Sequence, residues 1–323
     1  MTIAACASAP PETTPSAATR EKAVAILRAG LQGTGEADFW PAMHAAEGLT
    51  LAGYGHEVRT ALEPRLNAER DARKRCGLAR EIIRTGDVSK VASLAAILGS
   101  PDPYGHVHAA ESLFKVGEVG DVATERAFAQ QENGKLRLMA AAALGRCGTA
   151  KPRAVIREAL LGDDADGVML AAWILGQIGD KTDIEPLRSR LADAATPLGR
   201  ASVEHALAAL GDPEGLAALA RNLTSKDDAI RAAAANMAGE AGAVATVPTL
   251  VKLLDDRVPD VRIRAAQSLL MLARARQGAR RLTLDKKYTG VYALETLTLR
   301  DEPCRLKASA NCSASSRSSR FVS

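Results

Sequence analysis

The sequence predicts an all-α fold, a right-handed α-solenoid of about eight helix pairs that repeat every 31 residues or so. Three observations predict this class. Apolar residues make up 47% of the 323 residues but aromatic residues only 3%, so small and aliphatic side chains must fill the core. A pair of small residues recurs at a nearly constant spacing, and a glycine follows each pair at a fixed distance. Repetition with this period is typical of stacked helical repeats.

The pairs of small residues mark the second helix of each predicted repeat. Small side chains on one face of a helix let the neighbouring helix approach closely, because interiors are packed without voids. Successive pairs stand 31 to 33 residues apart. The first residues of the pairs are Ala45, Leu78, Ala109, Ala140, Ala171, Val203, Ala234 and Ala265.

The glycines mark the turns that follow these helices. Each stands eight residues after the first residue of a pair, at a point where helices often end in left-handed backbone that suits glycine. Only the eighth repeat departs, with Ala273 at this place. The predicted turn glycines are Gly53, Gly86, Gly117, Gly148, Gly179, Gly211 and Gly242.

The first helix of each repeat is predicted directly after the turn. Apolar residues recur there at helical spacing, as in Leu216, Leu219 and Leu223. A short polar link with Asp or Pro then leads to the second helix. Two helices in about 31 residues, joined by a tight turn, form the unit of an α-solenoid.

The last repeat shows the shared pattern in Val261-Arg262-Ile263-Arg264-Ala265-Ala266. The pattern Val-Arg-x-x-Ala-Ala-x-x-Leu-x-x-x-Gly resembles HEAT repeats, and most of all the short bacterial form called the PBS-lyase HEAT-like repeat. The resemblance covers about residues 20–276, most of the chain. It implies an armadillo-like helical array that binds other proteins. Some members of this family instead attach bilin chromophores to phycobiliproteins.

The segments outside the array have other compositions. Residues 1–19 are rich in Ala, Pro, Ser and Thr and are predicted to be a disordered tether. Residues 277–300 are predicted to cap the apolar end of the last repeat. Residues 301–323 are rich in Ser, Ala and Arg and are predicted to be a disordered tail.

The segment Ile3-Ala4-Ala5-Cys6 resembles the lipobox of bacterial lipoproteins, in which the cysteine is lipidated and a tether follows. Only two residues precede Ile3, so a signal peptide would need a start further upstream. Two alternatives stay open. Cys6 is a lipid anchor in the bacterial cell envelope, or the N-terminus is a plain tether on a cytoplasmic protein.

One set of arginines is predicted to be structural. Each stands three residues before a pair of small residues, where acidic residues of the links, such as Asp228 and Asp256, can meet it. The pattern resembles the ladder of Arg and Asp residues that connects successive HEAT-like repeats. The alternative is that these arginines bind a ligand. The arginines are Arg75, Arg137, Arg200, Arg231 and Arg262.

Specificity is expected where the repeats differ, at positions just before and just after the pairs. On the concave helix face these positions are predicted to bind a partner. The alternative is that these residues form a hydrogen-bonded strip that holds adjacent helices together. The candidate residues are His44, Glu47, Arg80, His108, Glu111, Trp173, His205 and Asn236. Trp173 either anchors a partner or fills a gap that its small neighbours leave.

The motif His-Ala-Ala-Glu occurs at residues 44–47 and 108–111, yet no metal site is predicted. Helices stack at roughly 10 Å, so positions two repeats apart lie about 20 Å from each other. The sequence also lacks motifs for nucleophilic catalysis or phosphate binding. No catalytic residue, cofactor or metal is therefore predicted.

The charge distribution bears on the class of partner. Residues 274–323 hold eleven basic and four acidic residues, whereas the other 273 hold 31 basic and 34 acidic ones. A body with a net charge of −3 disfavours nucleic acid. No run of 18 apolar residues is present, so no transmembrane helix is expected. The sequence predicts a monomeric, non-enzymatic scaffold for an unknown protein partner. The alternatives are a bilin lyase or chaperone of the PBS-lyase type and a nucleic-acid-binding solenoid.

Overall fold

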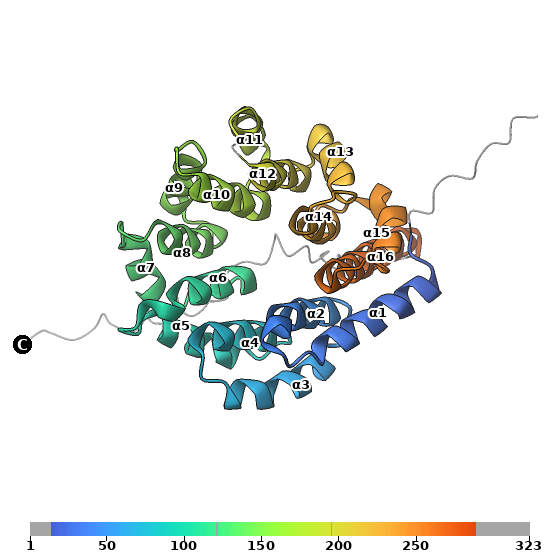
Figure 1. The fold of residues 1–323 in the computed structure, drawn as a ribbon, viewed down its shortest axis with the longest axis horizontal. Coiled ribbons are helices and arrows are strands. Elements are labelled where there is room, and N and C mark those ends of the chain that lie inside the picture. Colours follow the sequence, from blue (N-terminus) through green and yellow to red (C-terminus); the bar gives the residue numbers. More distant parts are fainter. Residues whose placement is uncertain (1–13, 121, 195, 289–323) are drawn as a thin grey trace, which may run out of the picture. The chain divides into compact units, whose positions relative to one another are not determined.

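A computed structural model describes residues 14–288 apart from residues 121 and 195. Over this range the chain forms sixteen α-helices, five short 3-10 helices and no strand (Figure 1). The predicted all-α class is confirmed, and the sixteen helices make eight pairs. The predicted tail and most of the predicted tether, including Cys6, lie outside the described residues.

The helices divide into two compact units. Residues 54–215 form unit 2, which comprises α3 to α12. The described parts of residues 1–53 and 216–292 form unit 1, which comprises α1, α2, most of α13, and α14 to α16. Unit 1 is α1 (Ala17–Leu31), α2 (Phe39–Leu51), α13 (Pro213–Asn222), α14 (Asp228–Glu240), α15 (Val247–Leu253) and α16 (Pro259–Tyr288). Unit 2 is α3 (Gly55–Ala68), α4 (Ala72–Arg84), α5 (Val91–Leu98), α6 (His106–Val116), α7 (Val122–Ala129), α8 (Gly134–Arg146), α9 (Ala150–Leu160), α10 (Ala165–Ile178), α11 (Ile184–Leu191) and α12 (Pro197–Ala209).

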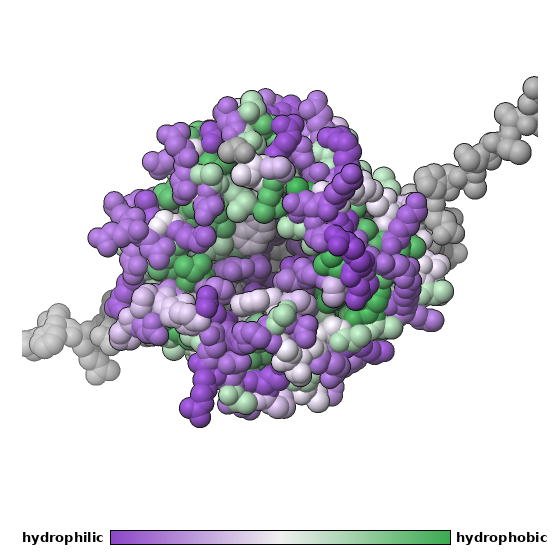
Figure 2. All heavy atoms as spheres, in the orientation of Figure 1, coloured by the Kyte–Doolittle hydropathy of each residue, from purple (hydrophilic) through white to green (hydrophobic). Residues whose placement is uncertain are grey.

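Unit 2 is a stack of helix pairs in two layers. The even-numbered helices α4 to α12 pack against one another in order, and each odd-numbered helix packs against the even one of its pair. In Figure 1 the even-numbered helices form a curved row, with the odd-numbered helices along its convex side. The even-numbered helices therefore form the concave side of this unit. Figure 2 shows hydrophilic residues over the outer helices α9 and α11.

Small residues allow the even-numbered helices to pack closely. Ala171 and Ala172 of α10 are fully buried. A Cβ atom at Gly176 would lie only 3.1 Å from the Cα atom of Ala206 on α12. The large buried Phe114 and a set of Leu and Ile side chains fill the spaces between the layers. The core is therefore filled mainly by alanine and aliphatic side chains, with few aromatic rings.

The predicted turn glycines follow the second helices of the repeats. All but Gly179 have left-handed backbone. Gly53, Gly86, Gly117, Gly148, Gly211 and Gly242 have positive φ angles, between 63° and 103°. Gly179 has a φ of −72° and extended backbone instead. Glycine is needed there for space, because a Cβ atom would lie 2.4 Å from the carbonyl oxygen of Leu175.

Unit 1 joins the first helix pair to the last helix of the chain. Both α1 and α2 pack against α16, which also packs against α14 and α15. Two glycines make the close approach possible. A Cβ atom at Gly30 of α1 would lie 2.9 Å from the Cδ1 atom of Ile263, and one at Gly48 of α2 would lie 3.2 Å from the Cβ atom of Gln267. The N-terminal repeat thus stands against the C-terminal one as a neighbouring repeat would.

The sequence predicted that residues 277–300 cover the apolar end of the last repeat, and in the structure α1 and α2 also pack against this repeat. Leu269, Leu270 and Leu272 are buried in α16, whose partners include α1 and α2. The helix itself runs on to Tyr288, into the segment predicted as a separate cap. Among the described helices, none combines the length and the apolar composition needed to cross a lipid bilayer.

Candidate interaction surface

All eight candidate binding residues lie on even-numbered helices, and they divide between the two units. His44, Glu47 and Asn236 belong to unit 1. The other candidates belong to unit 2, where they lie on α4, α6, α10 and α12.

In unit 1, His44 is the centre of a hydrogen-bonded group. Its Nδ1 atom lies 2.8 Å from a carboxylate oxygen of Asp260, and its Nε2 atom lies 2.6 Å from an NH2 group of Arg264. Arg264 also donates to the side-chain oxygen of Asn236 at 2.7 Å. Because Nε2 accepts from a guanidinium, the proton is on Nδ1 and is donated to Asp260. The group ties α2, α14 and α16 together. Glu47 lies half-buried on α2, one turn after His44.

His44 is held in its neutral form. Burial and the nearby charge of Arg264 lower its pKa to about 4, against the opposing effect of Asp260 and Glu47. Asp260 has a lowered pKa, because the hydrogen bond from His44 and the charge of Arg264 outweigh the effect of its burial. His44 therefore serves as a fixed link between the first and last helix pairs.

In unit 2, Arg80 is not available to a partner. Its side chain is 5% exposed, and its Nε atom donates to Glu81 at 2.7 Å. Glu81 is completely buried and also accepts from Arg84 at 2.8 Å. The three residues form a buried ion-pair cluster within α4.

Glu111 and His108 lie beside this cluster on α6. Glu111 forms an ion pair of 2.7 Å with Lys115. Burial would raise the pKa of Glu111, but Lys115 and Arg80 outweigh it and lower the pKa to about 2. Burial lowers the pKa of His108, with Glu111 acting in the opposite direction. This part of the predicted strip is a network of charges between α4 and α6.

His205 lies in the interior of unit 2, on α12. Its side chain is only 4% exposed, and burial lowers its pKa to about 4. Asn236, at the matching position of α14, donates to Glu240 at 2.8 Å in addition to its contact with Arg264. Both residues thus act within the fold.

Unfolding is expected to become easier as the pH falls below 6.5. His44 and His205 have folded-state pKa values of about 4, below the usual 6.5, so the stability they contribute is present above pH 6.5. It is lost as the pH falls from 6.5 toward 4, at roughly 2–3 kcal/mol for each histidine. Urea unfolding at pH 7 and at pH 4.5 measures this, and His205→Gln should reduce the difference by the contribution of one histidine. A pH dependence that is identical in His205→Gln and the parent would contradict the assignment.

Trp173 is one of six candidates that are half-buried, together with His44, Glu47, His108, Glu111 and Asn236. It is half-buried on α10, and its ring meets the edge of Phe114 on α6 at 5.5 Å between centroids. The Nζ atom of Lys115 lies 5.4 Å from the centre of the Trp173 ring. The helix between them, α8, has Ala142 at the position equivalent to Trp173. Trp173 therefore both fills the space that α8 leaves and presents part of its ring outside.

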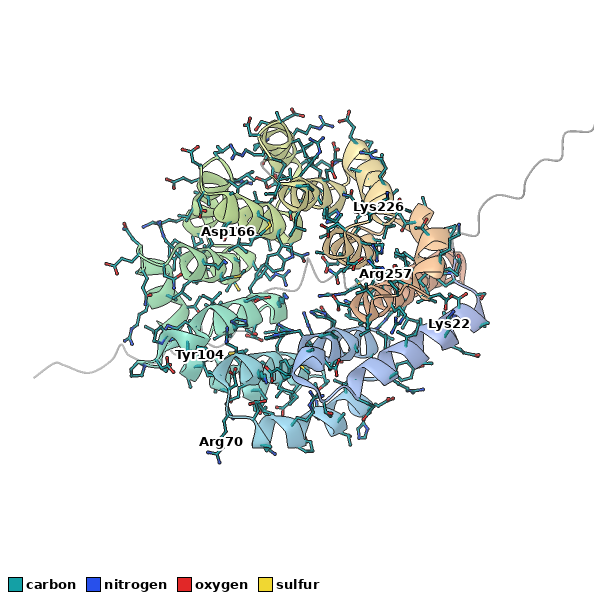
Figure 3. All side chains as sticks on the ribbon, in the orientation of Figure 1. Lys22, Arg70, Tyr104, Asp166, Lys226 and Arg257 are labelled. Atoms are coloured by element: carbon teal, nitrogen blue, oxygen red, sulfur yellow. The ribbon has the colours of Figure 1, made fainter. Side chains whose placement is uncertain are left out.

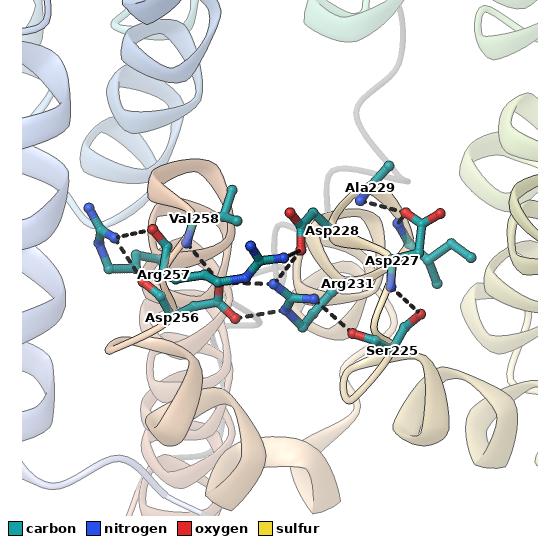
Figure 4. A network of polar contacts seen from close by, with 10 residues as sticks. Ser225, Asp227, Asp228, Ala229, Arg231, Asp256, Arg257 and Val258 are labelled. Carbon is teal, nitrogen blue, oxygen red and sulfur yellow. Dashed lines mark hydrogen bonds and ion pairs between the residues drawn. The ribbon is translucent and has the colours of Figure 1, made fainter.

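Of the arginines predicted to form a ladder, Arg231 forms an ion pair with an acidic residue of the next repeat. Arg231 of α14 binds Asp256 of the next repeat at 2.7 Å, Asp228 at 2.8 Å and the carbonyl oxygen of Ser225 at 2.7 Å (Figure 4). The hydrogen bonds that Arg231 donates to Asp256 and Asp228 raise the pKa of Arg231.

The other predicted ladder arginines act mostly within their own repeats. Arg75 donates to the carbonyl oxygen of Glu69 at 2.9 Å, and Arg262 donates to that of Asp256 at 2.8 Å. Arg200 donates to the carbonyl oxygen of Leu191 at 3.2 Å. These carbonyls lie at or just after the end of the preceding helix, where a cation is favourable. The guanidinium of Arg137 lies over the ring of Phe128.

The structure shows ties between repeats that the sequence reasoning missed. Arg157 of α9 binds Asp183 of the next repeat at 2.6 Å, and Arg188 of α11 binds Asp212 in the same way. Both aspartates are 1% exposed. The signal was present, because the two arginines stand 31 residues apart and Asp212 follows a turn glycine directly.

Within the described residues, no three His, Cys, Asp or Glu side chains gather closely enough to hold a metal ion. His44 and His108, from the two His-Ala-Ala-Glu motifs, lie in different units.

The stacked helix pairs and the regular turns define an α-helical repeat protein. Residues 121–208 and 197–270 match the family model of HEAT repeats. This part of the chain is therefore built from HEAT repeats. Among solved structures, human deoxyhypusine hydroxylase in complex with glycerol is similar, with a TM-score of 0.39 and 18% sequence identity over 80% of this chain and 98% of that one. No curated protein matches the chain.

Proposed function

We propose that the chain is a non-enzymatic scaffold that binds a partner protein through the even-numbered helices of unit 2. The observation that supports this best is the position of Trp173. Its ring is half-buried and is fixed by Phe114 and Lys115. An aromatic side chain that is already held in place loses little freedom on binding, and tryptophan is enriched among residues that dominate binding energy.

The surroundings of Trp173 favour an apolar residue in the partner, because Lys115 beside its ring is already paired with Glu111. Lys115 lies by the Trp173 ring, and the guanidinium of Arg146 lies 4.7 Å from the centre of the Phe114 ring.

Two features support a role without catalysis. Cys76 is buried, and this raises the pKa of its thiol to about 12, so it is no nucleophile. His44 and His205 are occupied in the interior, with pKa values well below the range of a general base at neutral pH. The period of about 31 residues also favours the short, PBS-lyase-like form of the repeat.

Replacing Trp173 by alanine is expected to reduce the recovery of bound proteins by tenfold or more, since the fixed ring is lost. The measurement is quantitative affinity capture from extract of the native cells. Trp40→Ala is the matched control, because Trp40 is the other tryptophan and packs at 5.0 Å against Phe39 in unit 1. Circular dichroism melts must show that both variants are folded. Equal recovery by the parent and Trp173→Ala would contradict the proposal.

A further inference from the structure

A cavity of about 300 Å³ opens between α8, α9 and α10 of unit 2. Four apolar residues, six charged residues and three glycines line it. At roughly 30 Å³ for each water molecule, this volume has room for one long side chain. The apolar residues that line it are Leu138, Val155, Ala159 and Leu170.

The charged residues that line the cavity carry more negative than positive charge, and the acidic ones are exposed. Lys135 and Arg137 are the two basic residues in the lining, and the guanidinium of Arg137 lies over the ring of Phe128. The four acidic residues are Glu158, Asp163, Asp164 and Asp166.

The acidic residues differ in how firmly they are held. The carboxylate of Asp164 accepts from the backbone N–H groups of Asp166 and Gly167 at 3.3 and 3.2 Å, and so it is fixed at the start of α10. Asp166 itself is 74% exposed and lies 3.9 Å from Lys135 (Figure 3). An exposed pair at this distance contributes little, so the Asp166 carboxylate is free to meet an incoming cation.

We infer that this cavity takes a basic side chain of the partner protein. Its aliphatic stem would lie along Leu138 and Leu170, and its charged head would meet the carboxylates at the mouth. Long basic side chains bury the stem and keep the head in a polar environment in this way. Arginine fits better than lysine, because its planar guanidinium can bind two carboxylates at once.

The inference rests on the proposed function, because the cavity and Trp173 share α10. Leu170 lines the cavity one turn before Trp173, and residues three apart lie on one face of a helix. Asp166 precedes Trp173 by seven residues, or about 10 Å of helix. About three residues of extended chain cover that distance. The partner segment would thus place its arginine about three positions from the apolar residue on Trp173.

The probes are N-acetyl-arginine N-methylamide and the citrulline analogue, which has the same shape without the charge. Both are titrated into the full chain while the methyl resonances of Leu138, Val155 and Leu170 are followed by NMR. Saturable shifts with the arginine probe, and binding at least tenfold weaker with the citrulline probe, are expected. The absence of saturable shifts with the arginine probe would overturn the inference.

Two variants test the site from different sides. Ala159→Phe fills the cavity and should abolish the shifts, and the double variant Glu158→Gln/Asp166→Asn should weaken the arginine probe at least tenfold. The exposed Glu185→Gln on α11 is the charge control. Binding that is unchanged in both test variants would also overturn the inference.

Trp173→Ala separates this inference from the proposed function. It should leave the arginine probe unaffected while it abolishes capture of the partner. If the probe fails to bind but capture still depends on Trp173, only the cavity assignment is lost. If the probe binds at the cavity but capture does not depend on Trp173, the scaffold surface is wrongly placed and the basic-side-chain site stands.

Discussion

Replacing Glu81 by alanine is expected to lower the free energy of unfolding by about 3–5 kcal/mol. Glu81 is fully buried and accepts from Arg80 and Arg84, which are themselves only 5% and 15% exposed. Without the carboxylate, a buried guanidinium loses its counter-charge and cannot reach water. Urea unfolding at pH 7, followed by circular dichroism, measures the change.

A control and a rescue make this test specific. Asp255→Ala removes an exposed ion pair with Lys22 at 2.6 Å and should cost less than about 1 kcal/mol. The triple variant Arg80→Met/Glu81→Leu/Arg84→Met replaces all three charges by apolar groups of similar size and should recover much of the loss. A loss for Glu81→Ala as small as that for Asp255→Ala would show that the cluster does not stabilise the fold.

Removing residues 1–53 is expected to turn the protein into an associating species. This truncation deletes α1 and α2, both of which pack against α16. It uncovers Ile263, which is 4% exposed in the intact chain. Exposed apolar faces of this kind mark sites of self-association. Size-exclusion chromatography with light scattering measures the mass of the truncated chain.

The matched control for the truncation removes only residues 1–13, which precede α1. That shorter chain is expected to elute with the mass of the full chain. Backbone amide hydrogen exchange should also become faster in α16, which loses its packing against α1 and α2. It should become faster in α14 as well, because α14 packs against α16. Equal mass and equal exchange for the two truncations would contradict the packing described for unit 1.

The sequence predicts the helices and their turns well, because the same helix-pair pattern recurs eight times in it. The pair of small residues allows neighbouring helices to pack closely, and the turn glycine ends the second helix. Both requirements appear in the local sequence. Gly179 shows the limit, since it has the same spacing as the other glycines but a different backbone and a different reason to be glycine.

The partners of side chains were much harder to predict than the helices. The partner of His44 is Asp260, which is 216 residues away in the chain, and no periodic pattern says that the two ends meet. Arg80 was expected on the surface, but its neighbour Glu81 binds it inside the fold. The contacts of Trp173 with Phe114 and Lys115 on α6, two repeats earlier, are likewise not written in any local pattern.

The joining of the first and last helix pairs has a consequence for synthesis of the chain. Helices α1 and α2 leave the ribosome first, yet their contacts with α16 form only when the last helix has been made. Unit 2, which is continuous from residue 54 to residue 215, is complete well before that. Contacts that are distant in sequence form late and leave apolar surface uncovered meanwhile. The first fifty residues are therefore the part of the nascent polypeptide that most needs protection by a chaperone.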